Sequence, residues 1–240
     1  AKAFADNTET AETGIDMDFY NPEKDEFIDW HYSKDDISGK MKCRNGLLNE
    51  LGFDADNAPV IGIVSRLVKH KGIELIRSVF EEIIRNGMKF AILGSGEKIY
   101  EDFFFEMAKR YPERVSMTTG FFPELSHKIY AGADMFLMPS QTEPCGLAQM
   151  ISMRYGTPPI VHETGGLRDT VRDNGGEYGN GFTFKTYDAD DMLNAVYRAK
   201  RDYYNKPRWN ELIVRSMSCD FGWNNSADDY IKIFKELINE

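Results

Sequence analysis

The residues of this chain whose types and spacing could do chemistry begin with Glu143 and Cys145. Both lie in MPSQTEPCGLAQMISMRYG, residues 138–156, where a short apolar run gives way to an apolar-periodic run that predicts a helix. The first amides of a helix have no intrahelical partners and lie at the positive end of the helix dipole, so they suit an anion. We therefore expect an anion to bind at the mouth of this helix.

A basic turn follows the first predicted strand. Arg66, Lys69 and Lys71 lie close together in SRLVKHKG, ahead of Gly72. Arg66 can bind a diphosphate through two parallel hydrogen bonds, and Lys71 can add a compact positive charge. Spacing alone fits a solvated basic turn equally well, so both interpretations stay open at this point.

A glycine pair and an aromatic pair follow two other predicted strands. Gly165 and Gly166 in HETGGLRDTV leave the backbone unobstructed, so an amide or a small polar ligand can approach it closely, although a bare turn explains them as well. Phe121 and Phe122 lie beyond Gly120 and could stack on a nucleotide base. Aromatic side chains of this kind more often belong to a core.

Two other motifs predict structure more than binding. GSGE, residues 94–97, lacks the third glycine of a dinucleotide-binding loop, because Ile99 holds that position. It predicts a tight turn from strand to helix. His127 is more typical of a helix surface or of a hydrogen-bonded position than of a ligand.

Alternating short apolar runs and helical patterns predict the elements that position these residues. The expected strands lie in PVIGIVSRL, MKFAILGSG, RVSMTTGF, DMFLMPS, TPPIVHET and GFTFK. Strands of about 4–8 residues separated by helices are typical of a parallel, doubly wound α/β sheet, which we predict to be Rossmann-like. Ligands of such sheets bind at the carboxyl ends of the strands, where the basic turn, Glu143 and the glycine pair converge.

Composition excludes several classes of partner. The chain has 240 residues, with 29 basic against 39 acidic side chains and a net charge of −10, which argues against general affinity for nucleic acid or an anionic membrane. No run of about 18 apolar residues predicts a membrane helix. Cys43, Cys145 and Cys219 are too few and too scattered for a disulfide framework or a zinc site, so we expect a reducing cytoplasm.

The two ends of the chain differ from its middle. Residues 1–22 are polar and resemble the middle of a longer protein, so we expect an arm that enters the domain. Residues 23–222 are expected to form the Rossmann-like domain. Residues 223–240 predict an amphipathic helix with apolar residues at helical spacing, namely Tyr230, Ile233, Phe234, Leu237 and Ile238.

Taken together and in this order, SRLVKHKG, GSGE, PSQTEPCGLAQM, YGTPPIV and TGGLRDTV resemble the C-terminal half of bacterial glycogen synthases and plant starch synthases. The similarity runs from GIDMDFYNP to the final helix. It implies the GT-B arrangement of two Rossmann-like domains facing a cleft, of which this chain is the nucleotide-sugar-binding one. The implied reaction moves glucose from ADP-glucose to the non-reducing end of an α-1,4-glucan, with retention of configuration, in the cytoplasm or in a plant plastid.

The resemblance also implies a half that this chain does not contain. That N-terminal half carries a K-x-G-G motif and much of the acceptor site, and helix 223–240 is expected to pack toward it. We therefore expect the isolated chain to have negligible polymerising activity, because one wall of the cleft is absent and water enters the open site.

The resemblance assigns roles to the candidate residues. Arg66 and Lys71 match a basic pair that stabilises the charge growing on the departing ADP, and Glu143 matches a residue that hydrogen-bonds glucose hydroxyls. Phe121 would lie over the adenine. The residues expected to contact the donor are Phe121, Cys145, Gly146, Leu147, Ala148, Gly165, Gly166 and Leu167, with the diphosphate on the backbone amides near 146–148 and Cys145 packing rather than reacting.

No side chain of the chain is placed as a nucleophile on the sugar. A retaining reaction without one suggests front-face transfer, in which the protein contributes position and positive charge, and we expect neither a metal nor a cofactor. Ala148 stands where many members of the family have a hydroxyl residue, so one side-chain contact is lost. Ile151 stands where other retaining enzymes of this fold have a second glutamate, which starch and bacterial glycogen synthases also lack.

Two alternatives remain. A UDP-glucose-dependent glucosyltransferase of the same fold would favour glutamate at position 151, so Ile151 argues against it. A non-catalytic glucan-binding module would need exposed aromatic stripes rather than a basic, glycine-lined edge. Titration with ADP separates that module from an enzyme.

Overall fold

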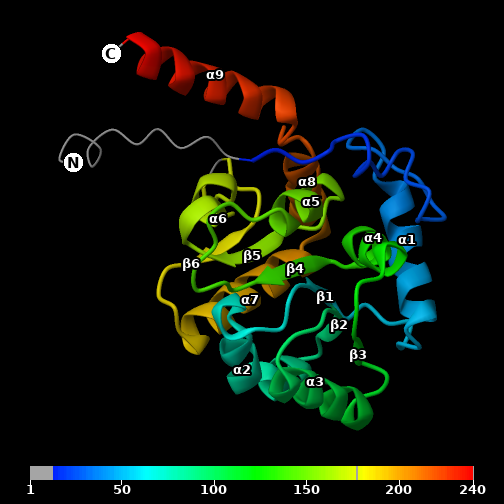
Figure 1. Cartoon of the computed structure of the whole chain (residues 1–240). Helices are drawn as coiled ribbons and strands as arrows, with labels where there is room; N and C mark the ends of the chain where they lie inside the picture. The colour runs from blue at the N-terminus through cyan, green and yellow to red at the C-terminus, as the bar shows by residue number, and fades with distance from the viewer. Residues whose placement is uncertain (1–12, 177, 240) are drawn as a thin grey trace.

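A parallel sheet forms the centre of the computed structural model, which describes residues 13–176 and 178–239 (Figure 1). Its strands are β1 (Val60–Val64), β2 (Lys89–Leu93), β3 (Val115–Thr118), β4 (Met135–Met138), β5 (Pro159–His162) and β6 (Phe182–Phe184). The strand order is β3-β2-β1-β4-β5-β6, and every neighbouring pair is parallel. This is the predicted Rossmann-like sheet, and its strands lie in the segments that the apolar runs indicated.

Helices cover both faces of the sheet, as parallel strands require. The helices are α1 (Ser38–Glu50), α2 (Ile73–Arg85), α3 (Lys98–Arg110), α4 (Pro123–Gly132), α5 (Ala148–Arg154), α6 (Gly165–Thr170), α7 (Ala189–Tyr204), α8 (Lys206–Met217) and α9 (Trp223–Asn239), with a 3₁₀ turn η1 (Lys69–Lys71). The helix α2 packs against α7, whereas α4 packs against α1 and α5, and α5 against α8. Right-handed crossovers place these two groups on opposite faces.

The core forms because apolar residues recur at the period of each element. In α2 the buried positions follow helical spacing, and they are Ile73, Ile76, Val79, Phe80, Ile83 and Ile84. The strand β2 is buried along its whole length, as expected for a central strand covered on both faces. At residues 94–97 the predicted tight turn is confirmed, because a Cβ on Gly94 would lie 1.9 Å from the Ser65 carbonyl oxygen and α3 begins directly afterwards.

The segment before α1 is held to the domain by a buried polar group, which we call the Asp25 cluster (Asp25, His127 and Tyr155). His127 Nδ1 lies 2.8 Å from Asp25 Oδ2, and the Tyr155 hydroxyl donates to the same oxygen. His127 is 1% exposed, so it is a hydrogen-bonded interior residue and not a surface one. The cluster therefore ties the chain near residue 25 to α4 and to the end of α5.

The segment at residue 15 is paired with the segment directly before α9. The Ile15 amide donates to the Phe221 carbonyl at 2.9 Å, and Ile15 is buried. Residues 1–12 of the predicted arm lie outside the described part of the chain, and its boundary at residue 22 stays a prediction. The predicted C-terminal helix is confirmed as α9, which extends away from the sheet (Figure 1).

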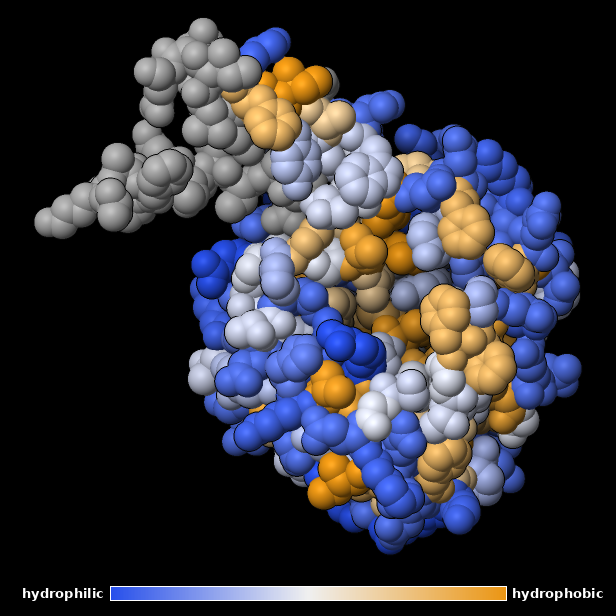
Figure 2. Space-filling model, in the orientation of Figure 1, coloured by the Kyte–Doolittle hydropathy of each residue, from blue (hydrophilic) through white to orange (hydrophobic). Residues whose placement is uncertain are grey.

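Apolar side chains of α9 are exposed, as Figure 2 shows at its upper left beside the residues drawn in grey. Tyr230 is 41% exposed and Phe234 is 59% exposed. The side chains of Ile233, Leu237 and Ile238 lie outside the described part of the structure. That α9 packs toward a further domain stays a prediction.

Candidate functional site

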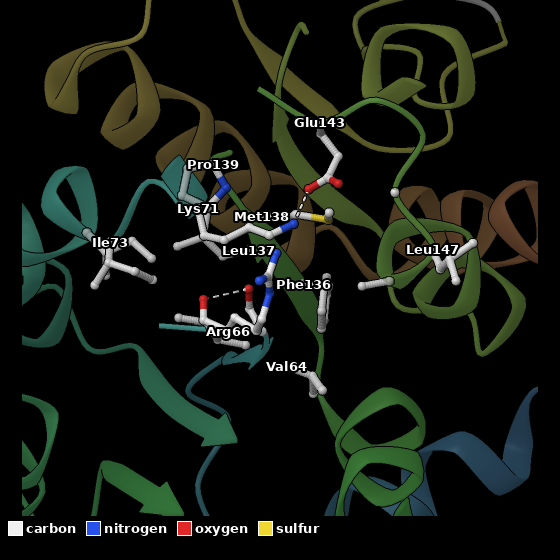
Figure 3. A pocket seen from close by; sticks show the side chains of 15 residues that line it. Val64, Arg66, Lys71, Ile73, Phe136, Leu137, Met138, Pro139, Glu143 and Leu147 are labelled. Atoms are coloured by element: carbon white, nitrogen blue, oxygen red, sulfur yellow. Dashed lines mark hydrogen bonds and ion pairs between the residues drawn. The ribbon is translucent and has the colours of Figure 1, made fainter. Parts of the chain in front are cut away.

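A pocket of about 160 Å³ opens at the carboxyl ends of β1 and β4, where the sequence predicted a ligand (Figure 3). The predicted site residues that line it are Arg66, Lys71, Glu143, Gly146, Leu147 and Ala148. Apolar side chains from the strands and from α2 form its floor, among them Val64, Ile73 and Phe136. The structure thus brings the basic turn, the carboxylate and the helix mouth to one place.

Close backbone approach places the basic turn beside the segment that follows β4. Gly72 has a φ of +79°, and a Cβ there would lie 2.0 Å from the Pro139 carbonyl oxygen. Glycine is therefore required for both the left-handed conformation and the contact. The Gln141 amide donates to the His70 carbonyl at 2.8 Å, which fixes the two segments together.

Lys71 and Glu143 form an ion pair across the pocket (Figure 3). Their side chains are 15% and 10% exposed, so the pair is shielded but still reaches solvent through the pocket. The Ser140 hydroxyl donates to Glu143 Oε2 at 3.1 Å, and Ser140 is itself fully buried. His162 Nδ1 lies 3.0 Å from the Ser140 carbonyl oxygen, so β5 supports the segment that carries the carboxylate.

Arg66 extends from the end of β1 toward the Lys71–Glu143 pair in Figure 3. Its side chain is exposed, and within residues 13–176 and 178–239 its guanidinium makes no hydrogen bond or ion pair. A guanidinium in this position can form two parallel hydrogen bonds to a phosphate group. Arg66 and the paired Lys71 supply the positive charge of the pocket.

The mouth of α5 is built by a glutamine that the sequence analysis did not single out. Gln149 is fully buried, and its Nε2 donates to the carbonyls of Cys145 at 3.1 Å and Gly146 at 2.9 Å. Gly146 has a φ of +78°, which lets the chain turn into the seven-residue helix. The sequence signal that could have indicated this role is the polar side chain of Gln149 at the second position of an otherwise apolar stretch. Its Oε1 is buried without a hydrogen-bond partner in the part of the chain that the structure describes.

The glycine pair is approached closely by the chain itself. A Cβ on Gly165 would lie 2.0 Å from the Glu143 carbonyl oxygen, and one on Gly166 would lie 2.3 Å from that of Cys145. The Gly166 amide donates to the Glu143 carbonyl at 3.1 Å. Gly165 and Gly166 therefore hold the loop that carries Glu143, and a direct contact with a ligand stays a prediction.

Three predicted site residues do not line the pocket with their side chains. Leu167 is fully buried, and its amide donates to the Thr164 carbonyl at 3.1 Å. Cys145 is half-buried, with its Sγ 3.7 Å from the Thr13 carbonyl oxygen. Phe121 follows the edge strand β3 and is 85% exposed. Their roles toward a donor stay predictions.

Comparison with known proteins identifies the family. The model of the family described as "Glycosyl transferases group 1" matches residues 52–211. The chain belongs to this family.

Relatives of known name extend that result over most of the chain. It is 46% identical to the glycogen synthase of Kosmotoga olearia over 228 residues, which cover 94% of this chain and 48% of that protein. The glycogen synthase of Bacillus cereus gives the same identity and the same coverage. The matched part is the C-terminal half of these proteins, as the sequence motifs predicted, so the chain spans about half the length of the curated relatives it matches.

A solved structure agrees with the family assignment. The catalytic domain of starch synthase IV from Arabidopsis thaliana, bound to ADP and acarbose, superimposes with a TM-score of 0.88 at 34% identity. The match covers 95% of this chain and 48% of that one. The fold is therefore that of one Rossmann-like half of a GT-B glycosyltransferase, as predicted.

Within residues 13–176 and 178–239, no three His, Cys, Asp or Glu side chains are grouped so that they could hold a metal ion. No described helix has both the length and the apolar character needed to cross a membrane.

Proposed function

We propose that this chain is the donor-binding half of a retaining glucosyltransferase that takes glucose from ADP-glucose and adds it to the non-reducing end of an α-1,4-glucan. The observation that carries the proposal is the pocket between β1 and β4, in which Arg66, Lys71 and Glu143 converge. Relatives at 46% identity are named glycogen synthase, and the starch synthase structure holds ADP. The ADP in the starch synthase structure favours ADP-glucose over UDP-glucose.

The charges of the pocket suit the two ends of such a donor. Arg66 and Lys71 would bind the diphosphate, whose negative charge grows as the bond to glucose breaks, and the amides of residues 146–148 would add hydrogen bonds. Glu143 would accept hydrogen bonds from glucose hydroxyls. Lys71 and Glu143 pair with each other in the pocket, so a donor would exchange this ion pair for contacts with its diphosphate and its glucose.

The reaction would proceed on one face of the sugar. The bond between C1 and the diphosphate oxygen breaks, and its electron pair stays on ADP. The acceptor hydroxyl bonds to C1 from the same face and gives its proton to a diphosphate oxygen. Fixed positive charge gains interaction energy along this path because it meets more negative charge in the transition state than in the ground state.

The glucan acceptor and the second wall of the cleft belong to this proposal as well. Because the chain covers 48% of the K. olearia relative, we expect transfer to glycogen only in a protein that also contains the remaining half. Action in the cytoplasm stays a prediction from the cysteine content, and action in a plastid stays a prediction from the family resemblance.

Calorimetry on the chain tests the donor part of the proposal. ADP should bind, and Arg66→Ala should weaken it by about tenfold, because a charge-assisted hydrogen bond is worth roughly 1.5–3 kcal/mol and Arg66 is exposed before the ligand binds. Arg85→Ala, an exposed arginine paired with Glu81 on α2, is the matched control and should change nothing.

The same titration separates the alternatives. UDP binding as tightly as ADP would favour the UDP-glucose enzyme of this fold. A chain that binds glycogen but binds neither ADP nor UDP would favour the non-catalytic module, and this result would refute the proposal.

A further inference from the structure

A second cavity lies at the opposite edge of the sheet from the candidate site. It has a volume of about 190 Å³ and is enclosed by α1, the amino end of β4, the end of α7 and the start of α8. Asp134, directly before β4, lines it, whereas Met138, the last residue of that strand, lines the pocket of the candidate site. We call this second space the amino-edge cavity. The proposed glucosyltransferase function gives it no role.

The walls of the amino-edge cavity are largely apolar and aromatic. They include Ile37, Met41, Tyr203, Trp209 and Ile213. The rings of Tyr203 and Trp209 meet edge to face, with their centroids 5.5 Å apart, and both side chains are almost fully buried. Such a wall is rigid and can cover a flat or branched apolar group.

The charged residues of the cavity are unevenly balanced. Lys40, Arg44 and Lys206 line it, against one carboxylate, Asp134. Asp134 Oδ2 accepts hydrogen bonds from Arg44 Nε at 3.0 Å and from the Val60 amide at 2.8 Å, so its charge is opposed by Arg44. Two lysines therefore remain without a carboxylate partner in the described part of the chain, although the 240 residues together carry a net charge of −10.

Lys40 contributes positive charge but no available hydrogen bond. Its ammonium donates to the carbonyls of Ala131 at 3.1 Å and Tyr155 at 2.9 Å and to the Thr157 hydroxyl at 2.7 Å. These oxygens are neutral, so they solvate the charge without cancelling it. Burial lowers the pKa of Lys40 to about 8, although the charge of Asp134 acts against this shift.

The ammonium of Lys206 has N–H groups that can donate to a ligand. Its ammonium lies 3.4 Å from the centroid of the Tyr203 ring, and it makes no hydrogen bond or ion pair with the residues that the structure describes. Burial lowers the pKa of this lysine, while the Asp134 charge acts against the shift and the Arg44 charge adds to it. A cation over a ring keeps its outward N–H groups for another acceptor.

We propose that the amino-edge cavity binds a small organic anion, a carboxylate carried on an aromatic or branched aliphatic body, with the carboxylate on Lys206 and the body in the cavity between Met41, Tyr203 and Trp209. The excess positive charge disfavours cations. An anion without an apolar body would leave the apolar lining of the cavity, which includes the exposed Met41, without contacts, and a neutral ligand would leave Lys206 unused. The site is independent of the proposed donor pocket.

Tryptophan fluorescence can follow binding at this site. The chain has three tryptophans, and Trp209 lines the cavity whereas Trp30 and Trp223 do not. Benzoate should change the emission, with a dissociation constant on the order of millimolar for so small a ligand. The response should be lost in Trp209→Phe. Benzyl alcohol, which has the ring without the charge, and acetate, which has the charge without the ring, should bind several-fold more weakly.

The charge is tested with a substitution that keeps the stem of the side chain. Lys206→Met should weaken benzoate binding by about three- to fivefold, the range of a partly exposed ion pair. Lys98→Met, at an exposed lysine paired with Asp102 on α3, is the matched control and should leave it unchanged. A parallel titration with 3-methylbutanoate decides whether the natural ligand class is aromatic or branched aliphatic.

Three outcomes would overturn the proposal. They are no binding of benzoate, equal binding of benzoate and benzyl alcohol, and benzoate affinity unchanged by Lys206→Met. ADP affinity measured on the same samples should stay constant, which shows that each variant is folded and that the cavity is separate from the donor pocket.

Discussion

The Asp25 cluster and the candidate pocket contain the same kind of group, a carboxylate paired with a basic side chain from a distant part of the sequence. Asp25 and His127 have side chains that are 1% and 2% exposed, whereas those of Glu143 and Lys71 are 10% and 15% exposed. The Asp25 carboxylate has hydrogen bonds from His127, Tyr155 and the Phe27 amide. Aromatic rings cover its partner on several sides.

The contact between Asp25 and His127 is structural, whereas the Lys71–Glu143 ion pair can exchange its partners. Tyr20 stacks on His127 with ring centroids 5.1 Å apart, and Phe27 lies at 4.8 Å, so no ligand can reach the cluster. Glu143 has Lys71 and Ser140 as partners and otherwise faces the pocket. Asp25 and His127, the covered pair, hold two segments together. Lys71 and Glu143, the open pair, keep their charges available to a ligand.

The largest effect on stability is expected from breaking the covered pair. His127→Ala should lower the free energy of unfolding by about 3–5 kcal/mol, because it leaves a buried carboxylate without a main partner and removes ring contacts. Urea denaturation measures it. His31→Ala is the matched control, since His31 is exposed and lies 3.0 Å from the Asp25 carbonyl oxygen, and it should cost far less. A His127→Ala protein that stayed stable but no longer bound ADP would show that the covered pair serves binding and not stability.

Breaking the open pair should act on catalysis and not on folding. In a protein that also contains the other half, Lys71→Ala should lower kcat by about 10²–10³, or roughly 2.7–4 kcal/mol, with a smaller change in KM. Glu143→Ala should lower kcat comparably while leaving ADP affinity nearly intact, because ADP has no glucose. Steady-state kinetics and calorimetry check both. Near-normal kcat in both variants would leave the pair as a structural contact.

A smaller effect concerns the exposed aromatic residue beyond the pocket. Phe121→Ala should weaken ADP binding by about two- to tenfold, the range of an aromatic stacking contact of roughly 0.5–1.5 kcal/mol, and should affect UDP less. Phe122→Ala is the control, because that ring lies against Gly120 and is 49% exposed. Calorimetry showing equal loss in both variants would argue against stacking by Phe121.

The smallest effect is a pH dependence of the covered pair. Burial alone would raise the pKa of Asp25, but hydrogen bonds from His127, Tyr155 and the Phe27 amide outweigh it and lower the pKa. Its stabilising contribution is therefore present above the unfolded value of about 3.9 and is lost as pH falls through the folded value. Asp25→Asn should flatten the acid limb of the stability profile by less than about 1.4 kcal/mol per pH unit. An unchanged limb would contradict this assignment.

The sequence predicted the sheet and the main charges of the site because both depend on local pattern and topology. Apolar runs located the strands, and the rule that ligands bind at their carboxyl ends placed Arg66, Lys71 and Glu143 together. The rule fixes the shared edge but not the packing within it. It could not show that the chain itself fills the space beside Gly165 and Gly166.

Contacts between distant residues account for what sequence alone did not reveal. Asp25 and His127 are 102 residues apart, and neither lies in a motif that indicates the other. Ser140 and Gln149 support the pocket through hydrogen bonds whose partners are set by loop geometry. The amino-edge cavity is formed by α1 and α8, which are far apart in sequence and meet only in the fold.

The Lys71–Glu143 pair has a consequence for how an anion finds the pocket. The two opposite charges form a short dipole whose field falls off quickly with distance. Lys71 therefore attracts a ligand that is still in solvent only weakly. Among the charged residues lining the pocket, Arg66 is the one whose charge is not balanced within it. Arg66 would thus attract an approaching diphosphate, although the net charge of the chain repels anions. The charge of Lys71 would act on the diphosphate only once the ligand separates it from Glu143.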